Sequence, residues 1–139
     1  IRWSIEDFQS SGAGKMDTPR ISAVRGAIQV ASDSKEAIAQ AAQKLFVRVL
    51  ETNDLHEEQI ASLLITQTGD LKSLNPATGL RMGGLASYVP LFCMPELEIE
   101  GMMKRVIRML FILKIHKNDL QPIYLDGAEL LRPDLMRNE

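Results

Sequence analysis

The stretch LFCMPELEIEGMMKRVIR, residues 91–108, carries the side chains of this sequence that are best suited to chemistry. It holds the single cysteine, Cys93, then the carboxylate of Glu96, and it ends in Arg108, which stands among apolar residues. Arg25 and Arg132 lie in similar surroundings near the two ends of the chain. Arginine is rarely buried without a partner, and its planar fork matches a carboxylate. These residues predict either ion pairs within the protein or a pocket for a small molecule with several carboxylates.

The residue types alone leave those two interpretations open. The acidic partners available to the arginines are Glu96, Glu98, Glu100 and Asp134. Cys93 also fits an inert buried thiol, since a nucleophilic cysteine needs a histidine partner and none is near in the sequence. Tyr124 alternates within a strand-like run and fits a core position as well as a pocket.

The sequence lacks the residue patterns that several common classes of enzyme use. No glycine-rich phosphate loop of the G-x-G-x-x-G or Walker type occurs. His56 and His116 are isolated, without a cysteine or carboxylate at metal-ligand spacing, and no Ser-His-Asp set can be assembled with them. The motifs therefore point to no phosphate loop, metal site or catalytic triad.

Composition limits the partners and the compartment. The 139 residues, 45% of them hydrophobic, fit one domain with a real core. A formal charge of -2 indicates no general affinity for nucleic acid or for an anionic membrane. The best apolar run, Val106 to Ile115, contains Arg108 and Lys114 and is too short to span a bilayer. A single cysteine suits a reducing compartment, so we expect a cytoplasmic protein.

The periodicity predicts a mixed sheet with helices packed on it, in the α+β or mixed α/β class. Residues 1–19, with small residues before Met16, read as an N-terminal extension or a segment foreign to the natural domain, which then spans 20–139. Gly26, inside the first strand, indicates a bulge or a close backbone approach. The expected elements are strand 20–30, a helix capped by Asp33 or Ser34 and running to about residue 51, strand 60–66, a short helix after Asn75, strands 88–94, 107–115 and 123–125, and more strand after the turn at 126–127.

Taken together, four motifs resemble the trimeric, mixed α/β type of bacterial chorismate mutase. They are AVRGAIQV, TGDLKSLNPATGLR, YVPLFCMPELEIEGMMKRVIR and IYLDGAELLRPDL, and they cover nearly everything from residue 20 to 135. The resemblance implies a five-stranded mixed sheet with helices on one face and a homotrimer that forms a pseudo α/β-barrel with active sites between subunits. It also implies the conversion of chorismate to prephenate, the branch step toward phenylalanine and tyrosine, without a metal or cofactor.

The resemblance also assigns roles to residues. Arg25 would bind a substrate carboxylate, Arg108 would reach the ether oxygen, Glu96 and Cys93 would lie near the ring hydroxyl, and Tyr124 would hold the enolpyruvyl carboxylate. The backbone of Phe92, Cys93, Met94, Pro95 and Glu96 would line the pocket. Arg81 would lie near its mouth, and Leu131 and Arg132 would belong to a C-terminal segment, a tail from about residue 132, that covers the cleft.

Four positions depart from the family pattern: Asn75, Thr78, Phe92 and Pro95. Phe92 and Thr78 favour a rival hypothesis, a non-catalytic trimer that binds a chorismate-like dicarboxylate. A second rival is an enzyme of the same fold that acts on a related substrate such as isochorismate. A third is a structural trimer whose arginines form internal ion pairs.

Overall fold

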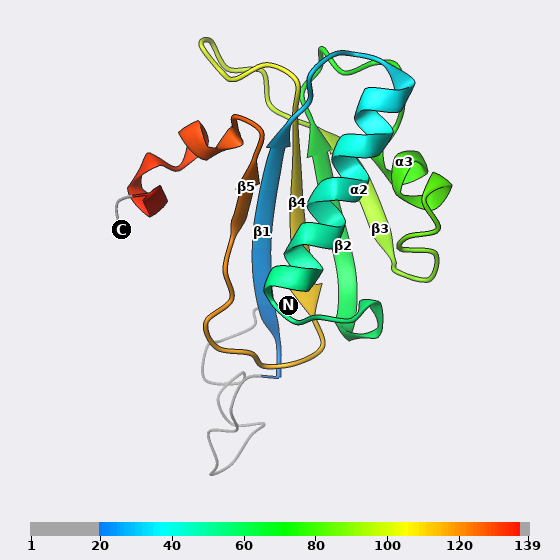
Figure 1. Ribbon diagram of the computed structural model, residues 1–139, viewed down its shortest axis with the longest axis vertical. Helices are drawn as coiled ribbons and strands as arrows, with labels where there is room; N and C mark the ends of the chain where they lie inside the picture. Colours follow the sequence, from blue (N-terminus) through cyan, green and yellow to red (C-terminus); the bar gives the residue numbers. More distant parts are fainter. Residues whose placement is uncertain (1–19, 137–139) are drawn as a thin grey trace, which may run out of the picture.

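The computed structural model describes residues 20–136, so the predicted extension 1–19 lies outside the described residues. Five strands and two α-helices follow one another in the predicted order (Figure 1). Their bounds are β1 Ser22–Gln29, α2 Lys35–Thr52, β2 Ile60–Gln67, α3 Pro76–Met82, β3 Leu91–Pro95, β4 Val106–Leu113 and β5 Ile123–Leu125. Short 3-10 helices span Glu57–Gln59, Ala128–Leu131 and Pro133–Met136.

The strands form one mixed sheet in the order β3-β2-β4-β1-β5. The central pairs β2-β4 and β4-β1 are antiparallel, whereas the outer pairs β2-β3 and β1-β5 are parallel. Both α-helices lie on the same face of this sheet, with α2 across β1 and β4 and α3 beside β2 and β3 (Figure 1). The predicted fold class is confirmed, and β3 and β5 are the edges of the sheet.

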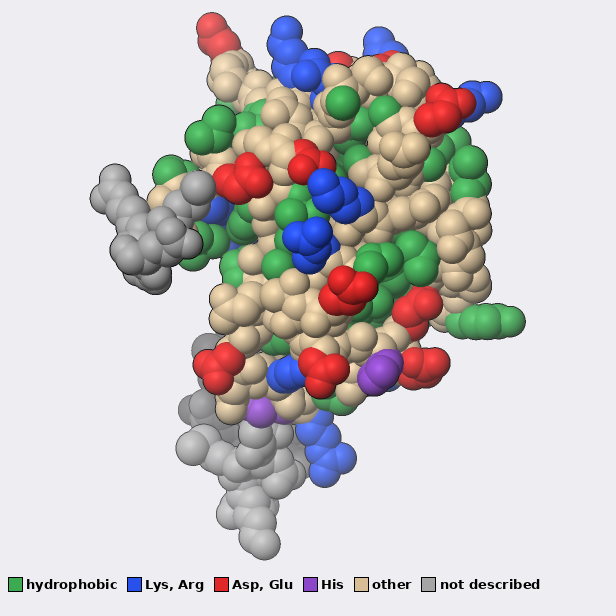
Figure 2. Space-filling model, viewed as in Figure 1, with side chains coloured by type: hydrophobic (Ala, Val, Ile, Leu, Met, Phe, Trp, Pro, Cys, Tyr) green, Lys and Arg blue, Asp and Glu red, His purple; other side chains and the backbone are tan. Residues whose placement is uncertain are grey.

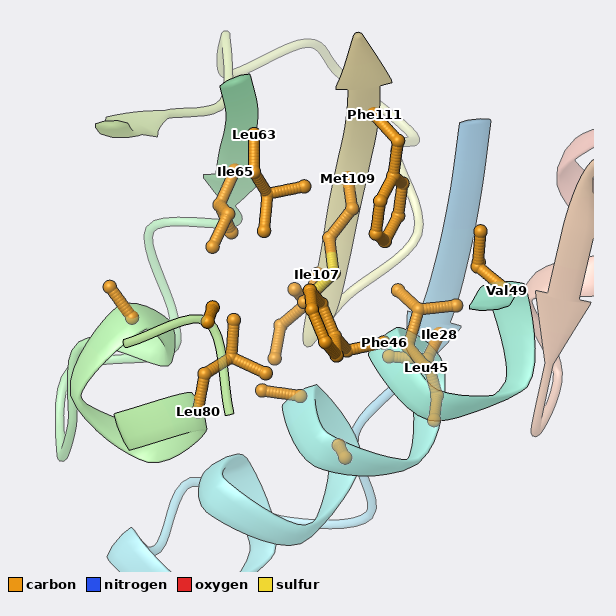
Figure 3. Packing of buried hydrophobic residues seen from close by; sticks show 14 of the residues in the cluster. Ile28, Leu45, Phe46, Val49, Leu63, Ile65, Leu80, Ile107, Met109 and Phe111 are labelled. Atoms are coloured by element: carbon orange, nitrogen blue, oxygen red, sulfur yellow. The ribbon is translucent and has the colours of Figure 1, made fainter. Parts of the chain in front are cut away.

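Helix α2 builds the core because its apolar residues recur on one side. Ser34 caps the helix by accepting a hydrogen bond from the Ala37 amide at 3.1 Å. Leu45 and Phe46 are fully buried against the strands, and the rings of Phe46 and Phe111 lie 5.6 Å apart (Figure 3). The fully buried side chains are Phe46, Phe111, Ile28, Ile38, Leu45, Ile60, Leu63, Ile65, Leu80, Ile107, Met109 and Leu113.

Gly26 is the place where α2 comes closest to β1. A Cβ atom at this position would lie 2.9 Å from Leu45 and 3.1 Å from Val49, closer than side chains pack. The pairing of β1 with β4 runs without a shift through this point. The close approach predicted for Gly26 is therefore present, and the alternative of a bulge is wrong.

Because side chains alternate along each strand, the sheet has a second face that neither α-helix covers, and we call it the open face. Val24 and Ile28 of β1 point into the core, so Arg25 and Ala27 point to the open face. A small buried cluster forms here from Ala27, Val106 and Ala128. The cluster docks the first turn after β5 onto the open face.

The structure corrects the prediction for the segment after residue 127. It continues as 3-10 helices and not as strand. The reason is the sheet itself: β5 pairs only with residues Gly26 to Ile28 of β1, and β1 ends at Gln29, so a longer β5 would have no partner. Gly127, with φ of 109°, turns the chain away at this point.

Charge is evenly mixed on the face that the helices cover. Figure 2 shows acidic and basic side chains interspersed there, without an extended field of one sign. Such a surface lacks the clustered lysines and arginines of a nucleic-acid site. Within residues 20–136, no helix has the length and apolar character needed to cross a membrane.

Candidate active site

A cavity of about 340 Å³ opens on the open face of the sheet, and we call it the open-face cavity. Its volume lies in the range of small-molecule sites. Strands β1, β2, β4 and β5 form its floor, and the segments after β3 and β5 form its sides. The lining residues are Arg25, Gly26, Ala27, Leu64, Thr66, Met94, Glu96, Arg108, Met109, Leu110, Tyr124, Leu131 and Arg132.

Arg108 and Glu96 form an ion pair inside this cavity. The Nε atom of Arg108 lies 2.9 Å from Oε1 of Glu96, and the Glu96 side chain is only 18% exposed, against 52% for Arg108. The hydroxyl of Thr66 donates to the same Oε1 atom at 2.8 Å. Thr66 lies opposite both Arg108 on β4 and Met94 on β3, so the sheet register itself brings these side chains together.

Arg25 and Tyr124 complete the polar lining on the other side of the cavity. Arg25 stands opposite Leu110 of β4, and Tyr124 stands opposite Ala27 of β1. Ala27 in turn stands opposite Arg108, so Tyr124 lies in the same row of the sheet as Arg108, with β1 between them. Within residues 20–136, Arg25 makes no ion pair. Its guanidinium is exposed and available to an anion from outside the chain.

Arg132 lies at the rim of the open-face cavity together with Leu131. Its Nε and a terminal nitrogen donate to the two carboxylate oxygens of Asp134 at 3.0 and 2.8 Å. This pairing raises the pKa of Arg132, with smaller contributions from Tyr124, and lowers the pKa of Asp134. Arg108 and Arg132 thus have the acidic partners that the ion-pair interpretation expects, yet both face the cavity.

Cys93 lies on the other side of β3, in a second hollow of about 360 Å³ that we call the edge cavity. It stands opposite Ile65, a core residue, whereas the next residue, Met94, stands opposite Thr66 on the open face. The thiol donates to Oδ1 of Asn75 at 3.0 Å, and the same oxygen accepts the Ala77 amide at 2.8 Å to cap α3. The lining residues are Gln67, Thr68, Gly69, Leu71, Asn75, Cys93, Met94 and Pro95.

The electrostatics of Cys93 favour the neutral thiol. Burial raises the pKa of Cys93, while the Ala77 backbone and the positive charge of Arg81 oppose that shift. Arg81 closes the last turn of α3, so it lies on the helix side of the sheet and not in the open-face cavity. A neutral thiol is a hydrogen-bonding group and a poor nucleophile.

The structure thus divides the predicted site residues between two faces. The open-face cavity brings together Arg25, Met94, Glu96, Arg108 and Tyr124. The edge cavity holds Cys93 and Pro95, with Arg81 nearby. Phe92 lines neither of these two cavities and is 74% exposed.

Thr66 and Leu64 are pocket residues that the sequence analysis did not single out. Both lie in the run IASLLIT, which reads as a continuous buried strand. The signal that identifies them is the period of two: Leu63 and Ile65 are fully buried, so Leu64 and Thr66 must face the opposite side.

The arrangement suits a small ligand with carboxylate groups. Three guanidinium groups and one phenol surround the cavity. Glu96 pairs with Arg108 and Asp134 pairs with Arg132, whereas Arg25 has no ion pair among the described residues. Groups of His, Cys, Asp and Glu that could hold a metal are not found in the part of the chain that the structure describes. The side chains present can bind carboxylates, orient a flexible ligand and stabilise negative charge.

Comparison with known proteins identifies the family. The family model for chorismate mutase type I matches residues 21–135. Chorismate mutase AroH of Bacillus subtilis (strain 168) is 32% identical over 117 residues, 83% of this chain and 92% of that protein. Chorismate mutase AroH of Thermus thermophilus is 38% identical over 115 residues, 81% and 93% of the two chains. The solved chorismate mutase from Clostridium thermocellum superposes with a TM-score of 0.74 at 32% identity, covering 78% of this chain and 98% of that one. The chain therefore belongs to the chorismate mutase type I family.

Proposed function

We propose that this protein is an isomerase that rearranges chorismate to prephenate in the open-face cavity. The observation that carries the proposal is the Arg108–Glu96 pair at 2.9 Å, inside a cavity that Arg25 and Tyr124 also line. Chorismate is a dicarboxylate, and a site with several guanidinium groups suits it. The rearrangement is unimolecular and needs neither a nucleophile nor a proton transfer, which agrees with a lining that includes no histidine among the described residues.

In the proposed mechanism, the bond to the ether oxygen breaks ahead of the new carbon-carbon bond. Negative charge then grows on that oxygen while the ring gains positive character. Arg108 supplies a fixed cation to the oxygen, and Glu96 accepts a hydrogen bond from the ring hydroxyl and favours the positive ring. Because these charges develop only along the reaction, both side chains stabilise the transition state more than bound chorismate.

Arg25 and Tyr124 have a different task, which is orientation. The enolpyruvyl arm of chorismate is flexible and must fold over the ring before bonds can change. A guanidinium and a phenol that hold its carboxylate fix the arm in that conformation. The two residues come from neighbouring strands with continuous pairing, so their positions are set by the sheet.

We further propose that the active unit is a homotrimer. Cys93, Pro95 and Arg81 belong to the predicted site, yet within one chain Cys93 and Pro95 line the edge cavity and Arg81 lies in α3, apart from Arg108. A second copy that brings its edge cavity against the open-face cavity would complete the set. The open face also carries half-buried apolar side chains, such as Leu64 and Leu110, that a neighbouring subunit would cover. The expected mass in solution is three times the 15.5 kDa of the chain, measured by light scattering.

The domain limits and the location are proposals of the same kind. Residues 20–139 would form the catalytic domain, which the family match over 21–135 supports. The single cysteine supports a cytoplasmic protein. Substrate and the two other subunits would be its partners.

The decisive test is to add purified protein to chorismate, follow the loss of its diene absorbance and identify the product. Rapid loss with prephenate as the product is the expected result. Binding of chorismate without loss would replace the proposal with a binding protein, and absence of binding would leave a structural trimer. Isochorismate, assayed in parallel, tests the related-substrate alternative, and a higher kcat/KM with it would change the assigned substrate.

A further inference from the structure

We propose that Thr66 is a positioning residue that holds Glu96 ready for the reaction. The inference rests on the function proposed above and adds a residue that acts through Glu96. Two contacts to one oxygen support it: Thr66 Oγ1 donates a hydrogen bond to Oε1 of Glu96 at 2.8 Å, and Arg108 Nε forms an ion pair with the same atom at 2.9 Å.

The geometry leaves the second carboxylate oxygen for the substrate. A carboxylate accepts through both oxygens, and Oε2 of Glu96 has no hydrogen-bond partner among the described residues. With Oε1 held by the Thr66 hydroxyl and paired with Arg108, the carboxylate has less freedom to rotate, and Oε2 is left to accept a hydrogen bond from a ligand. The ring hydroxyl of chorismate would donate to that oxygen.

Glu96 needs such support because of its place in the chain. It follows the last residue of β3, and its amide donates to the Gln67 carbonyl at 2.9 Å, the final contact of the strand pair. The next residue, Leu97, is 77% exposed at the start of the loop to β4. The backbone of Glu96 is therefore fixed on one side only, whereas Thr66 sits within β2 between two neighbouring strands. Catalytic groups on loops are held in place by rigid neighbours of this kind.

Arg108 alone would not fix the carboxylate. Its side chain is 52% exposed, and its charge is needed at the ether oxygen during the reaction. Thr66 is β-branched, so its hydroxyl has few orientations and little freedom to lose. We infer that Thr66 keeps Glu96 in place while the guanidinium of Arg108 interacts with the ether oxygen of the substrate.

The experiment compares Thr66→Val and Thr66→Ser in the full chain, using chorismate turnover. Valine keeps the shape and strand preference but removes the donor, and serine keeps the donor. We expect Thr66→Val to lower kcat by roughly tenfold to a hundredfold with a smaller change in KM, because a hydrogen bond to a charged group is lost. Thr66→Ser should remain within about threefold of the parent, since its hydroxyl makes the same contact.

A second background separates positioning from other roles. In Glu96→Ala, Thr66 has nothing to position, so adding Thr66→Val should change kcat by less than about twofold. An equal loss in both backgrounds would mean that Thr66 contacts the substrate directly or only supports the fold, and it would overturn the inference. Parental activity of Thr66→Val would do the same. Thermal melts show whether the variants are folded. If Thr66→Val is unfolded, Thr66→Ala replaces it as the variant without a donor.

The failure of this inference is distinguishable from that of the proposed function. If the parent protein does not convert chorismate, both proposals fall together. If the parent converts chorismate and the variants do not follow the expected pattern, only the role of Thr66 falls.

Discussion

The two cavities on either side of strand β3 differ in how their polar groups are engaged. In the open-face cavity, Arg25 has no ion-pair partner among the described residues and Arg108 is half exposed, so charge is available to a ligand. In the edge cavity, the Cys93 thiol and the cap of α3 share one oxygen of Asn75. The open-face cavity can act on a ligand, whereas the polar groups of the edge cavity mainly form hydrogen bonds with one another. This contrast supports the proposal that the chemistry belongs to the open face and that the edge cavity supplies shape and contacts.

The largest expected effect comes from changing the cation of the open face. Arg108→Lys keeps the charge but loses the planar fork and the ion-pair contact of Nε with Glu96. We expect kcat to fall on the order of 10³, while mass and circular dichroism stay as in the parent. The assay is loss of chorismate absorbance. Arg48→Lys, on the exposed side of α2, is the matched control and should change kcat by less than about twofold.

If Arg108→Lys converted chorismate near the parental rate, the open-face cation would not carry the chemistry. The proposed difference between the two cavities would then be wrong.

A smaller effect is expected from the phenol. Tyr124→Phe keeps the ring of the half-buried side chain and removes only the hydroxyl. Because the hydroxyl is assigned to holding a carboxylate, we expect KM to rise about tenfold with little change in kcat. Steady-state kinetics separates the two constants. A loss confined to kcat would move Tyr124 from orientation to transition-state stabilisation.

On the edge side, the expected effect is on stability. Asn75→Ala removes the cap of α3 and the acceptor of the Cys93 thiol together. We expect a loss of about 0.5–2 kcal/mol in the free energy of unfolding, seen as a lower Tm, and faster alkylation of Cys93 by iodoacetamide. Asn75→Asp keeps both acceptor roles and is the matched control. If Asn75→Ala left Tm and the alkylation rate unchanged, the edge cavity would have no structural role of this kind.

The smallest effect should come from the thiol itself. Cys93→Ser retains a donor for Asn75, so we expect turnover within about threefold of the parent. In the parent protein, the raised pKa of Cys93 keeps the thiol protonated at neutral pH, and the alkylation rate should rise only at pH above the ordinary range of cysteine. Complete loss of turnover in a folded Cys93→Ser protein would give the thiol a direct part in the chemistry.

Much of the fold could be predicted because the local signals agree with the final packing. The helical spacing of Ile38, Leu45 and Val49 and the cap at Ser34 specify α2, and the branched runs specify β2 and β4. The predicted family is confirmed by the relatives. The segment after residue 127 was predicted wrongly because Asp-Gly reads locally as a hairpin turn, whereas the end of β1 at Gln29 removes the partner strand.

The site was predictable only in part, because a sequence motif does not say which face of a strand a residue occupies in a finished sheet. Arg25, Glu96, Arg108 and Tyr124 all line one cavity. Cys93 lies next to Met94 in sequence but points to the other side of β3. The roles assigned to these residues remain predictions that the variants above test.

Two adjacent residues of β1, Arg25 and Gly26, meet different requirements on the two faces of the sheet. The arginine faces the cavity, and the absent side chain of its neighbour lets Leu45 approach β1 from the opposite side. A methyl group at position 26 would require Leu45, Val49 or the backbone of β1 to shift, and any movement of β1 would carry Arg25 with it. Leu45 and Val49 are therefore buried positions where a substitution is expected to change turnover without touching the cavity.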